Sequence, residues 1–195
     1  MGQVSSLRRF CLSWIRADRG ALDEARALAT ELCEYGVAQR LPPEECRGRW
    51  VLAEVLRRQG DLEGAERELE VALRLVAPLE RPAILGTLTE LRLAQGRTAE
   101  ALAAAEEAIA RYTAMHGCGM FRGTAIRLAH AEALHATGDL DAARAAITEA
   151  RARLLAVAGK IEDPTYRRSF IEEVAVNART FALARAWLGE PATDA

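Results

Sequence analysis

Apolar residues along this chain recur three and four positions apart, which is the spacing of amphipathic α-helices. In the stretch before Gly20 these residues are Leu7, Phe10, Cys11, Trp14 and Ile15. In the stretch after Gly60 they are Leu62, Ala65, Leu69, Ala72, Leu73 and Val76. Applied to the whole chain, the pattern predicts helices near residues 3–18, 22–38, 43–59, 62–77, 81–95, 98–115, 121–137 and 140–159.

A glycine followed five residues later by an alanine recurs at intervals of 40, 36 and 42 residues. The pairs are Gly20/Ala25, Gly60/Ala65, Gly96/Ala101 and Gly138/Ala143. Glycine suits the left-handed residue that ends a helix, and Asp61 and Asp139 are placed to cap the helix that follows. The small alanine lets the two helices of a pair approach closely. A repeat of this period predicts a stacked array of helix hairpins.

The predicted array occupies residues 1–160, as hairpins near 3–38, 43–77, 81–115 and 121–159. Beyond it, Asp163-Pro164 has the form of an N-cap with proline at the first helical position. Residues 161–188 are predicted to form one capping helix, or two joined near Asn177, that covers the last hairpin. The covering residues would be Phe170, Val174, Phe181, Ala184 and Leu188. Residues 189–195 are expected to be a frayed tail.

These hairpins resemble tetratricopeptide (TPR) repeats over roughly residues 3–159. The resemblance lies in the Gly-Asp turn, the following alanine, and a small or apolar residue seven positions further on (Leu32, Ala72, Ala108 and Ala150). The spacing exceeds the family's usual 34 residues, and the Trp and Tyr typical of the first helix are missing, so the class is divergent. The resemblance implies an all-α fold, a right-handed α-α superhelix of four hairpins with a C-terminal cap.

The C-terminal segment, Asp163 to Glu172 followed by Asn177-Ala178-Arg179, resembles the C-terminal TPR region of large bacterial serine/threonine kinases and related signalling proteins. Where that family places a proline and an acidic residue before the asparagine, this chain has Ala175-Val176. The sequence holds none of the Gly-rich loop, HRD or DFG motifs of a kinase. The resemblance therefore implies a non-catalytic protein-interaction scaffold in bacterial signalling or regulation.

In a TPR-type superhelix the first helices of the hairpins line a concave groove, so equivalent positions form columns along it. Six residues before each glycine stand Trp14, Glu54, Glu90 and Glu132, and ten before stand Phe10, Trp50, Gly86 and Leu128. We expect the glutamates, with Arg57, to bind a basic segment of a partner protein or peptide. Phe10, Trp14 and Trp50 would hold an apolar anchor of that partner. The alternatives are a solvated face for the glutamates and a core or subunit contact for the aromatic residues.

Composition and charge further limit the fold and the partners that we expect. Half of the 195 residues are hydrophobic but only 5% are aromatic, which favours helices over strands. The net charge of −2 combines 26 basic and 28 acidic side chains without a basic stripe, so no nucleic-acid partner is expected. The sequence has no apolar run of ~18 residues, so no membrane association is expected. The cysteines (Cys11, Cys33, Cys46 and Cys118) lie far apart, as in a reduced cytoplasmic protein.

The sequence offers few candidate metal ligands or catalytic residues. His116, Cys118, His130 and His135 suggest a metal site only superficially, because the last two histidines are five apart and no carboxylate-rich or CxxC partner completes four-fold coordination. We therefore expect no metal, no cofactor and no catalytic residue. Two alternatives to the scaffold stay open: self-association as a homodimer through the apolar N-terminal hairpin, and an enzyme that uses Cys118 with a histidine.

Overall fold

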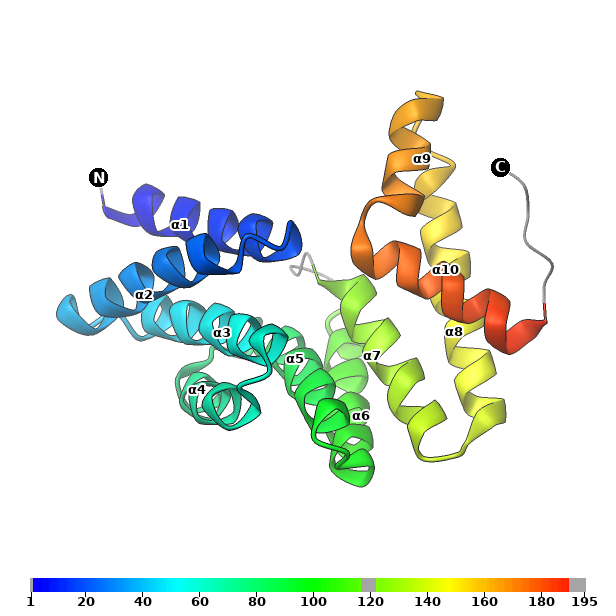
Figure 1. Cartoon of the computed structure of the whole chain (residues 1–195), viewed down its shortest axis with the longest axis horizontal. Helices are drawn as coiled ribbons and strands as arrows, with labels where there is room; N and C mark the ends of the chain where they lie inside the picture. Colours follow the sequence, from blue (N-terminus) through cyan, green and yellow to red (C-terminus); the bar gives the residue numbers. More distant parts are fainter. Residues whose placement is uncertain (1, 117–121, 190–195) are drawn as a thin grey trace.

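The computed structural model describes residues 2–116 and 122–189, and the side chains of residues 6–116 and 122–189. Within these ranges all regular structure is α-helical (Figure 1). The helices are α1 (Gly2–Asp18), α2 (Leu22–Ala38), α3 (Pro42–Gln59), α4 (Leu62–Leu75), α5 (Arg81–Ala94), α6 (Thr98–Ala114), α7 (Gly123–Ala136), α8 (Leu140–Ala158), α9 (Pro164–Glu172) and α10 (Ala175–Leu188). The prediction of an all-α fold is confirmed.

Each of the four periodic glycines ends a helix in the left-handed conformation, with φ between 73° and 87°. At the second turn, Gly60 N–H donates to the Arg57 carbonyl at 3.1 Å and Asp61 N–H donates to the Leu56 carbonyl at 3.0 Å. This is the Schellman arrangement, which satisfies carbonyls that the helix end would leave unbonded. The Asp61 carboxylate then accepts from Gly64 N–H at 2.8 Å and caps α4. The predicted stop and start signals are therefore both present.

The alanines of the repeat lie at the contact between the two helices of each hairpin. Ala25, Ala65, Ala101 and Ala143 are all fully buried. The residues seven positions further on are buried as well (Leu32, Ala72, Ala108 and Ala150). Small side chains at these points allow close helix packing, and this is the physical reason for the glycine–alanine register.

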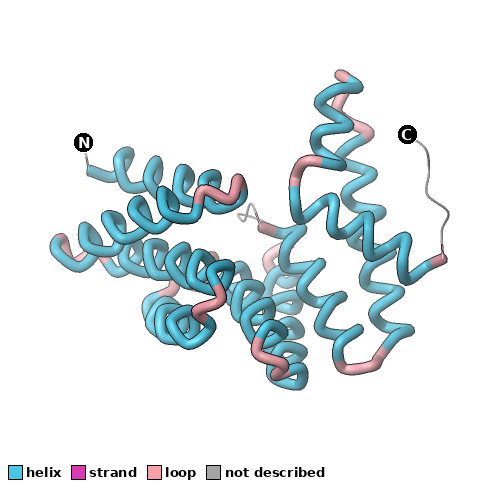
Figure 2. Tube along the Cα trace, in the orientation of Figure 1, coloured by secondary structure: helices cyan, strands magenta, loops and turns pink. Residues whose placement is uncertain are grey.

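Successive hairpins stack into an elongated array, with α1 at one end and α10 at the other (Figures 1 and 2). Each hairpin packs on the one before it, and the α2–α3 contact is especially close. A Cβ on Gly48 would lie 2.6 Å from the backbone nitrogen of Cys33, and one on Gly36 would lie 2.3 Å from that of Glu45. One buried cluster runs from Phe10 in α1 to Ile126 in α7. The first three hairpins and the start of α7 therefore share one core, while Leu128 and Ile147 of the fourth hairpin pack with α10 in a separate cluster.

The C-terminal segment forms two helices, an outcome that the sequence left open. Asp163 caps α9 by accepting from Thr165 N–H at 2.7 Å, and Asn177 donates from Nδ2 to the Phe170 carbonyl at 2.8 Å across the break. α10 covers the end of the fourth hairpin, where Ala184 packs with Leu128.

The residues of α10 that cover this hairpin are partly those expected. Ala184 and Leu188 do so, together with Val176, Leu183 and Trp187. Val174 is 41% exposed instead, because α10 begins only at Ala175 and its buried face is set from there. Of the expected frayed tail, residues 190–195 lie outside the described part of the chain.

Candidate functional site

The positions ten residues before each turn glycine belong to the core and do not line an open surface. Phe10, Trp50 and Leu128 are between 0 and 5% exposed, and Gly86 is buried. The ring centroids of Phe10 and Trp50 are 5.8 Å apart, and Trp14 meets Trp50 edge to face at 5.1 Å. Edge-to-face contact is a favoured geometry for aromatic packing. These rings join α1 to α3.

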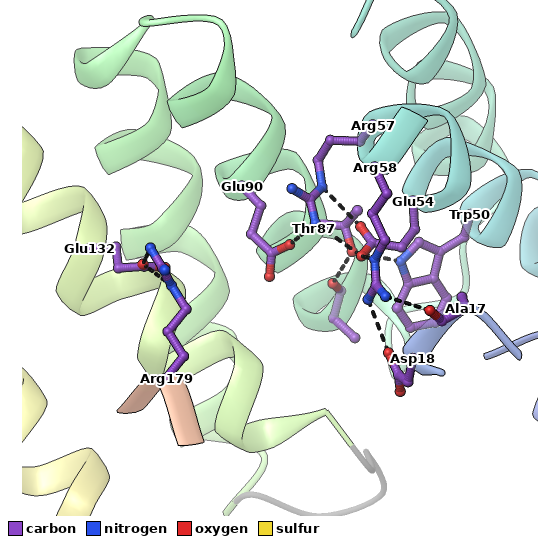
Figure 3. Close-up of polar contacts among 11 residues, drawn as sticks. Ala17, Asp18, Trp50, Glu54, Arg57, Arg58, Thr87, Glu90, Glu132 and Arg179 are labelled. Carbon is purple, nitrogen blue, oxygen red and sulfur yellow. Dashed lines mark hydrogen bonds and ion pairs between the residues drawn. The ribbon is translucent and has the colours of Figure 1, made fainter. Parts of the chain in front are cut away.

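The indole of Trp50 extends this contact to the third hairpin. Its Nε1 donates to the Thr87 hydroxyl of α5 at 2.8 Å, with both residues buried (Figure 3). We expected Phe10, Trp14 and Trp50 to hold an apolar anchor of a partner. In the structure these side chains are buried, because they pack the first three hairpins against one another. Helical spacing alone does not distinguish the two uses.

Glu54 stands six residues before its glycine, as expected, but it is fully buried. Its carboxylate accepts from Arg57 Nε and Nη2, both at 3.0 Å, and from Arg58 Nε at 2.6 Å. Burial alone would raise the pKa of this carboxyl, but Arg57 and Arg58 outweigh it and the pKa is lowered. A partner therefore cannot contact Glu54 in this structure, and the expectation of direct contact is corrected.

Arg58 connects this carboxylate to the end of the first helix. Its Nη1 donates to the Ala17 carbonyl at 2.6 Å, and its Nη2 pairs with the Asp18 carboxylate at 3.0 Å. A cation at a helix C-terminus stabilises the partial negative charge there. Arg58 thereby ties α3 to α1 next to the buried Glu54.

Arg57 connects the same carboxylate to the third hairpin. Its Nη2 lies 2.8 Å from Glu90 Oε2, with side chains 21% and 23% exposed. The pKa of Glu90 is raised to about 7, first because of burial and then because of the nearby Glu54 charge; Arg57 and Arg122 oppose the shift only in part. The Glu90 side chain is thus mostly buried, with about a quarter of its surface exposed, and its surroundings disfavour the negative charge.

The third glutamate, Glu132 of α7, pairs with the C-terminal helix α10. It accepts from Arg179 Nε of α10 at 2.6 Å, and the two side chains are 15% and 61% exposed. We call Asp18, Glu54, Arg57, Arg58, Glu90, Glu132 and Arg179 the charged row, which Figure 3 shows across α3, α5, α7 and α10. The structure thus brings the three predicted glutamates onto one side of the array, each paired with arginine.

Of the arginines on this face, the sequence predicted only Arg57 as a site residue. Arg58 could have been found, because it lies four residues after Glu54 on the same helix. Arg179 is 47 residues from Glu132, and no local pattern signals such a pair. Arg122 makes a cation–π contact over a still longer stretch of sequence, with its guanidinium carbon 3.8 Å from the ring centroid of Trp14.

A hollow lies between α6, α7 and α8, and no residue of the charged row lines it. Its volume is about 920 Å³, and Tyr112, Arg127, His130, Glu149 and Arg153 are among the residues that line it. Burial lowers the pKa of His130, so its imidazole is neutral at physiological pH. This cleft is another surface that could accommodate a ligand, and a smaller hollow of about 460 Å³ lies next to it, lined by Thr124, Leu154 and Phe170 among others.

Within the described part of the chain, the structure does not bring the remaining candidate metal-binding and catalytic residues together. In residues 6–116 and 122–189 no three His, Cys, Asp or Glu side chains lie together as a metal ion would require. His135 stacks on Trp187 with ring centroids 4.3 Å apart, and Cys118 lies outside the described residues. Among the described helices, none is both long enough and apolar enough to cross a bilayer.

Comparison with known proteins agrees with this architecture. The family model for the tetratricopeptide repeat matches residues 47–70, 82–107 and 124–149. Each matched segment includes a turn glycine and the alanine that follows it, as in the hairpin register. These three segments therefore match tetratricopeptide repeats, and repeats of this kind generally mediate protein–protein interaction.

Solved structures show the same fold. The crystal structure of the nearly identical TPR-like repeats of a Podosopora anserina protein, named for kinesin light chain, superimposes with a TM-score of 0.61 at 20% identity. The alignment covers 97% of this chain and 93% of that one. A glutamine-to-methionine variant of that protein gives the same score and identity over 92% of its length. No curated protein sequence matches the chain. The chain is thus a TPR-like helical solenoid, and its resemblance to bacterial kinase C-terminal regions stays a prediction.

Proposed function

We propose that this chain is a non-catalytic scaffold that binds a peptide or helix of a partner protein along the face bearing the charged row. The setting we propose is cytoplasmic bacterial signalling or regulation. One observation supports this most: charged side chains from all four hairpins and α10 form one line that solvent reaches at Asp18, Arg57, Glu90, Glu132 and Arg179. A continuous line across several repeats suits an extended ligand better than a small molecule.

The partner segment we propose is basic. Glu90 lies near the carboxylates of Glu54 and Glu132, and the guanidinium groups of Arg57 and Arg122 offset their effect on its pKa only in part. Each carboxylate oxygen can accept more than one hydrogen bond. A lysine or arginine of the partner placed at Glu90 and Glu132 would therefore add a charge-assisted hydrogen bond where the negative charge of Glu90 is least stabilised.

The buried members of the predicted site support this face from beneath. Glu54 holds Arg57 in place for Glu90, and Trp50 fixes α5 against α3 through Thr87. Phe10 and Trp14 pack against Trp50. In this proposal the partner contacts Glu90, Glu132 and Arg57 directly, and the other residues set their positions.

The test is a selection from a displayed library of short random peptides on the purified chain. We expect the retained peptides to be enriched in Lys and Arg, and the variant Glu90→Arg/Glu132→Arg to lose their binding by about tenfold or more. Loss of two charge-assisted contacts of roughly 1.5–3 kcal/mol each would suffice for this. Glu54 is left unchanged because its replacement would disturb the fold.

The matched control is Glu34→Arg/Glu70→Arg, which makes the same charge change at exposed positions of α2 and α4. It should retain peptide binding. Equal weakening in both double variants would indicate a general charge effect, and no enrichment of basic peptides would remove the basic partner from the proposal.

A further inference from the structure

Basic, hydroxyl and apolar groups line the smaller of the two adjoining hollows, whose volume is about 460 Å³. Its polar side chains come from α6, α7 and α8 and are those of Tyr112, Thr124, Arg127 and Arg153. The other lining residues are small or apolar: Gly123, Ala150, Leu154, Ala156, Val157 and Phe170. The described residues that line this hollow therefore carry two positive charges and no negative one.

Tyr112 is a buried residue whose hydroxyl has no hydrogen-bond partner among the described residues. The residue is 8% exposed and lines both hollows. Its Oη forms no hydrogen bond within the described chain, and it is not sealed from solvent. A Cβ on Gly123 would overlap Oη and lie 2.7 Å from Cζ, so glycine leaves the room that this hydroxyl needs. Because a buried tyrosine hydroxyl usually has a partner, the free one points to a molecule in the hollow.

Helix α7 begins beside this hydroxyl without a side-chain cap. Its N-cap residue is Arg122, whose guanidinium has no acceptor atom, and its first turn holds no acidic residue. The start of a helix carries unbonded N–H groups and a partial positive charge, which an anion stabilises. Since Gly123 and Thr124 of this turn line the hollow, an anion bound there would supply the missing acceptor.

The two arginines of the hollow keep donors for a ligand. The guanidinium carbon of Arg127 lies 4.8 Å from the Tyr112 ring centroid, and its Nη1 donates to the Gly123 carbonyl at 3.3 Å. Arg153 donates from Nε to Glu149 at 2.9 Å, and Glu149 lines only the larger hollow. These contacts hold each guanidinium in place and leave further N–H groups unused, because a guanidinium has five.

The polar side chains of this lining all donate hydrogen bonds, and the remaining wall is apolar. A hollow of this volume is within the usual range for small-molecule sites. We propose that the smaller hollow binds a small organic anion, a carboxylate or phosphate group on an apolar body. The anionic group lies between Tyr112, Arg127, Arg153 and the start of α7, and the body contacts Leu154 and Phe170.

Titration of the ¹⁵N-labelled full chain with phenyl phosphate and with phenylacetate tests this site. We expect at least one of them to shift the amides of Gly123, Thr124 and Arg153, with a Kd of about 1 mM or lower, as suits a ligand of about ten non-hydrogen atoms. The tighter of the two identifies the anionic group. Benzyl alcohol, which lacks the charge, and inorganic phosphate, which lacks the apolar body, should each bind about tenfold more weakly or worse.

Two variants test the assigned residues. Tyr112→Phe and Arg153→Gln should each weaken binding of the anion by about tenfold. Tyr112→Phe should keep the melting temperature of the free chain, because the hydroxyl makes no hydrogen bond there. The matched control is Arg168→Gln, which removes the same charge at an exposed position of α9 outside the hollow, and it should retain the wild-type affinity.

The proposal is overturned if neither anion shifts these amides, or if either variant keeps the wild-type affinity. Equal affinity for benzyl alcohol or for inorganic phosphate would also overturn it. None of these results bears on peptide binding, because no residue of the charged row lines the hollow.

Discussion

Glu54 and Glu90 share the guanidinium of Arg57, yet their surroundings shift their pKa values in opposite directions. Glu54 has two arginines within hydrogen-bonding distance, and its pKa falls below the ordinary value of 4.5. Glu90 has only Arg57 at such a distance in the described residues, and its pKa rises to about 7. These two glutamates lie close together in space, yet a change in pH alters the stability of the fold in opposite directions through them.

The signs follow from linkage. A lowered pKa means that Glu54 stabilises the fold above pH 4.5, and that this stability is lost as pH falls through the lowered value. A raised pKa means that Glu90 contributes no penalty below pH 4.5, and that the penalty develops between pH 4.5 and about 7. Above pH 7 its ionisation costs the folded state the full amount.

We therefore predict opposite effects for two isosteric substitutions. Glu54→Gln should lower the free energy of unfolding by about 3–5 kcal/mol at pH 8, because it leaves two partly buried arginines without the fully buried carboxylate that pairs with them. Glu90→Gln should become more stable relative to the wild type as pH rises from 5 to 8. Urea unfolding of the three proteins at both pH values measures this. A Glu90→Gln difference that is constant with pH would contradict the assignment.

At the scale of helices, glycine has two distinct roles in this chain. At Gly60 it supplies a left-handed turn, and a Cβ there would meet no atom within 4 Å. At Gly48, inside α3, it permits the close crossing with α2. The first role could be predicted from the sequence because it is local, whereas the second depends on a neighbour that the pattern does not identify.

Replacement of two helical glycines tests this distinction. Gly48→Ala should destabilise the chain by about 1–3 kcal/mol, because its Cβ would lie 2.6 Å from Cys33 N and 2.8 Å from the Ala29 carbonyl oxygen. Gly86→Ala, whose nearest atom would be Ile126 Cγ1 at 3.4 Å, should be neutral or stabilising by up to about 1 kcal/mol. Thermal and urea unfolding would compare them. A Gly48→Ala variant no less stable than Gly86→Ala would show that the α2–α3 crossing is looser than described.

The sequence predicted the elements better than the site, for physical reasons. Helix ends depend on residues within a few positions, such as Asp163 or the turn glycines, and these were identified. Whether Trp50 or Glu54 faces solvent depends on how α3 crosses its neighbours, which periodicity does not contain. The pairing of Glu132 with Arg179 depends on where α10 folds back, and so no sequence pattern predicted it.

At the scale of the whole molecule, the charged row joins segments that are far apart in sequence. Arg58 connects α3 to α1, Arg57 connects α3 to α5, and Arg179 connects α10 to α7. The aromatic residues beneath provide the apolar part of the same connections. One side of the solenoid is thus held together by ion pairs that solvent reaches, and a charged ligand could compete for them.

The central claim is that a partner binds at the charged row and not in the cleft between α6 and α8. The most direct test is a titration of the ¹⁵N-labelled chain with a basic peptide from the selection, monitored by amide chemical shifts. We expect the largest shifts at Arg57, Glu90 and Glu132 and at Arg179 in α10. Largest shifts at the residues that line the cleft, such as His130, would contradict it.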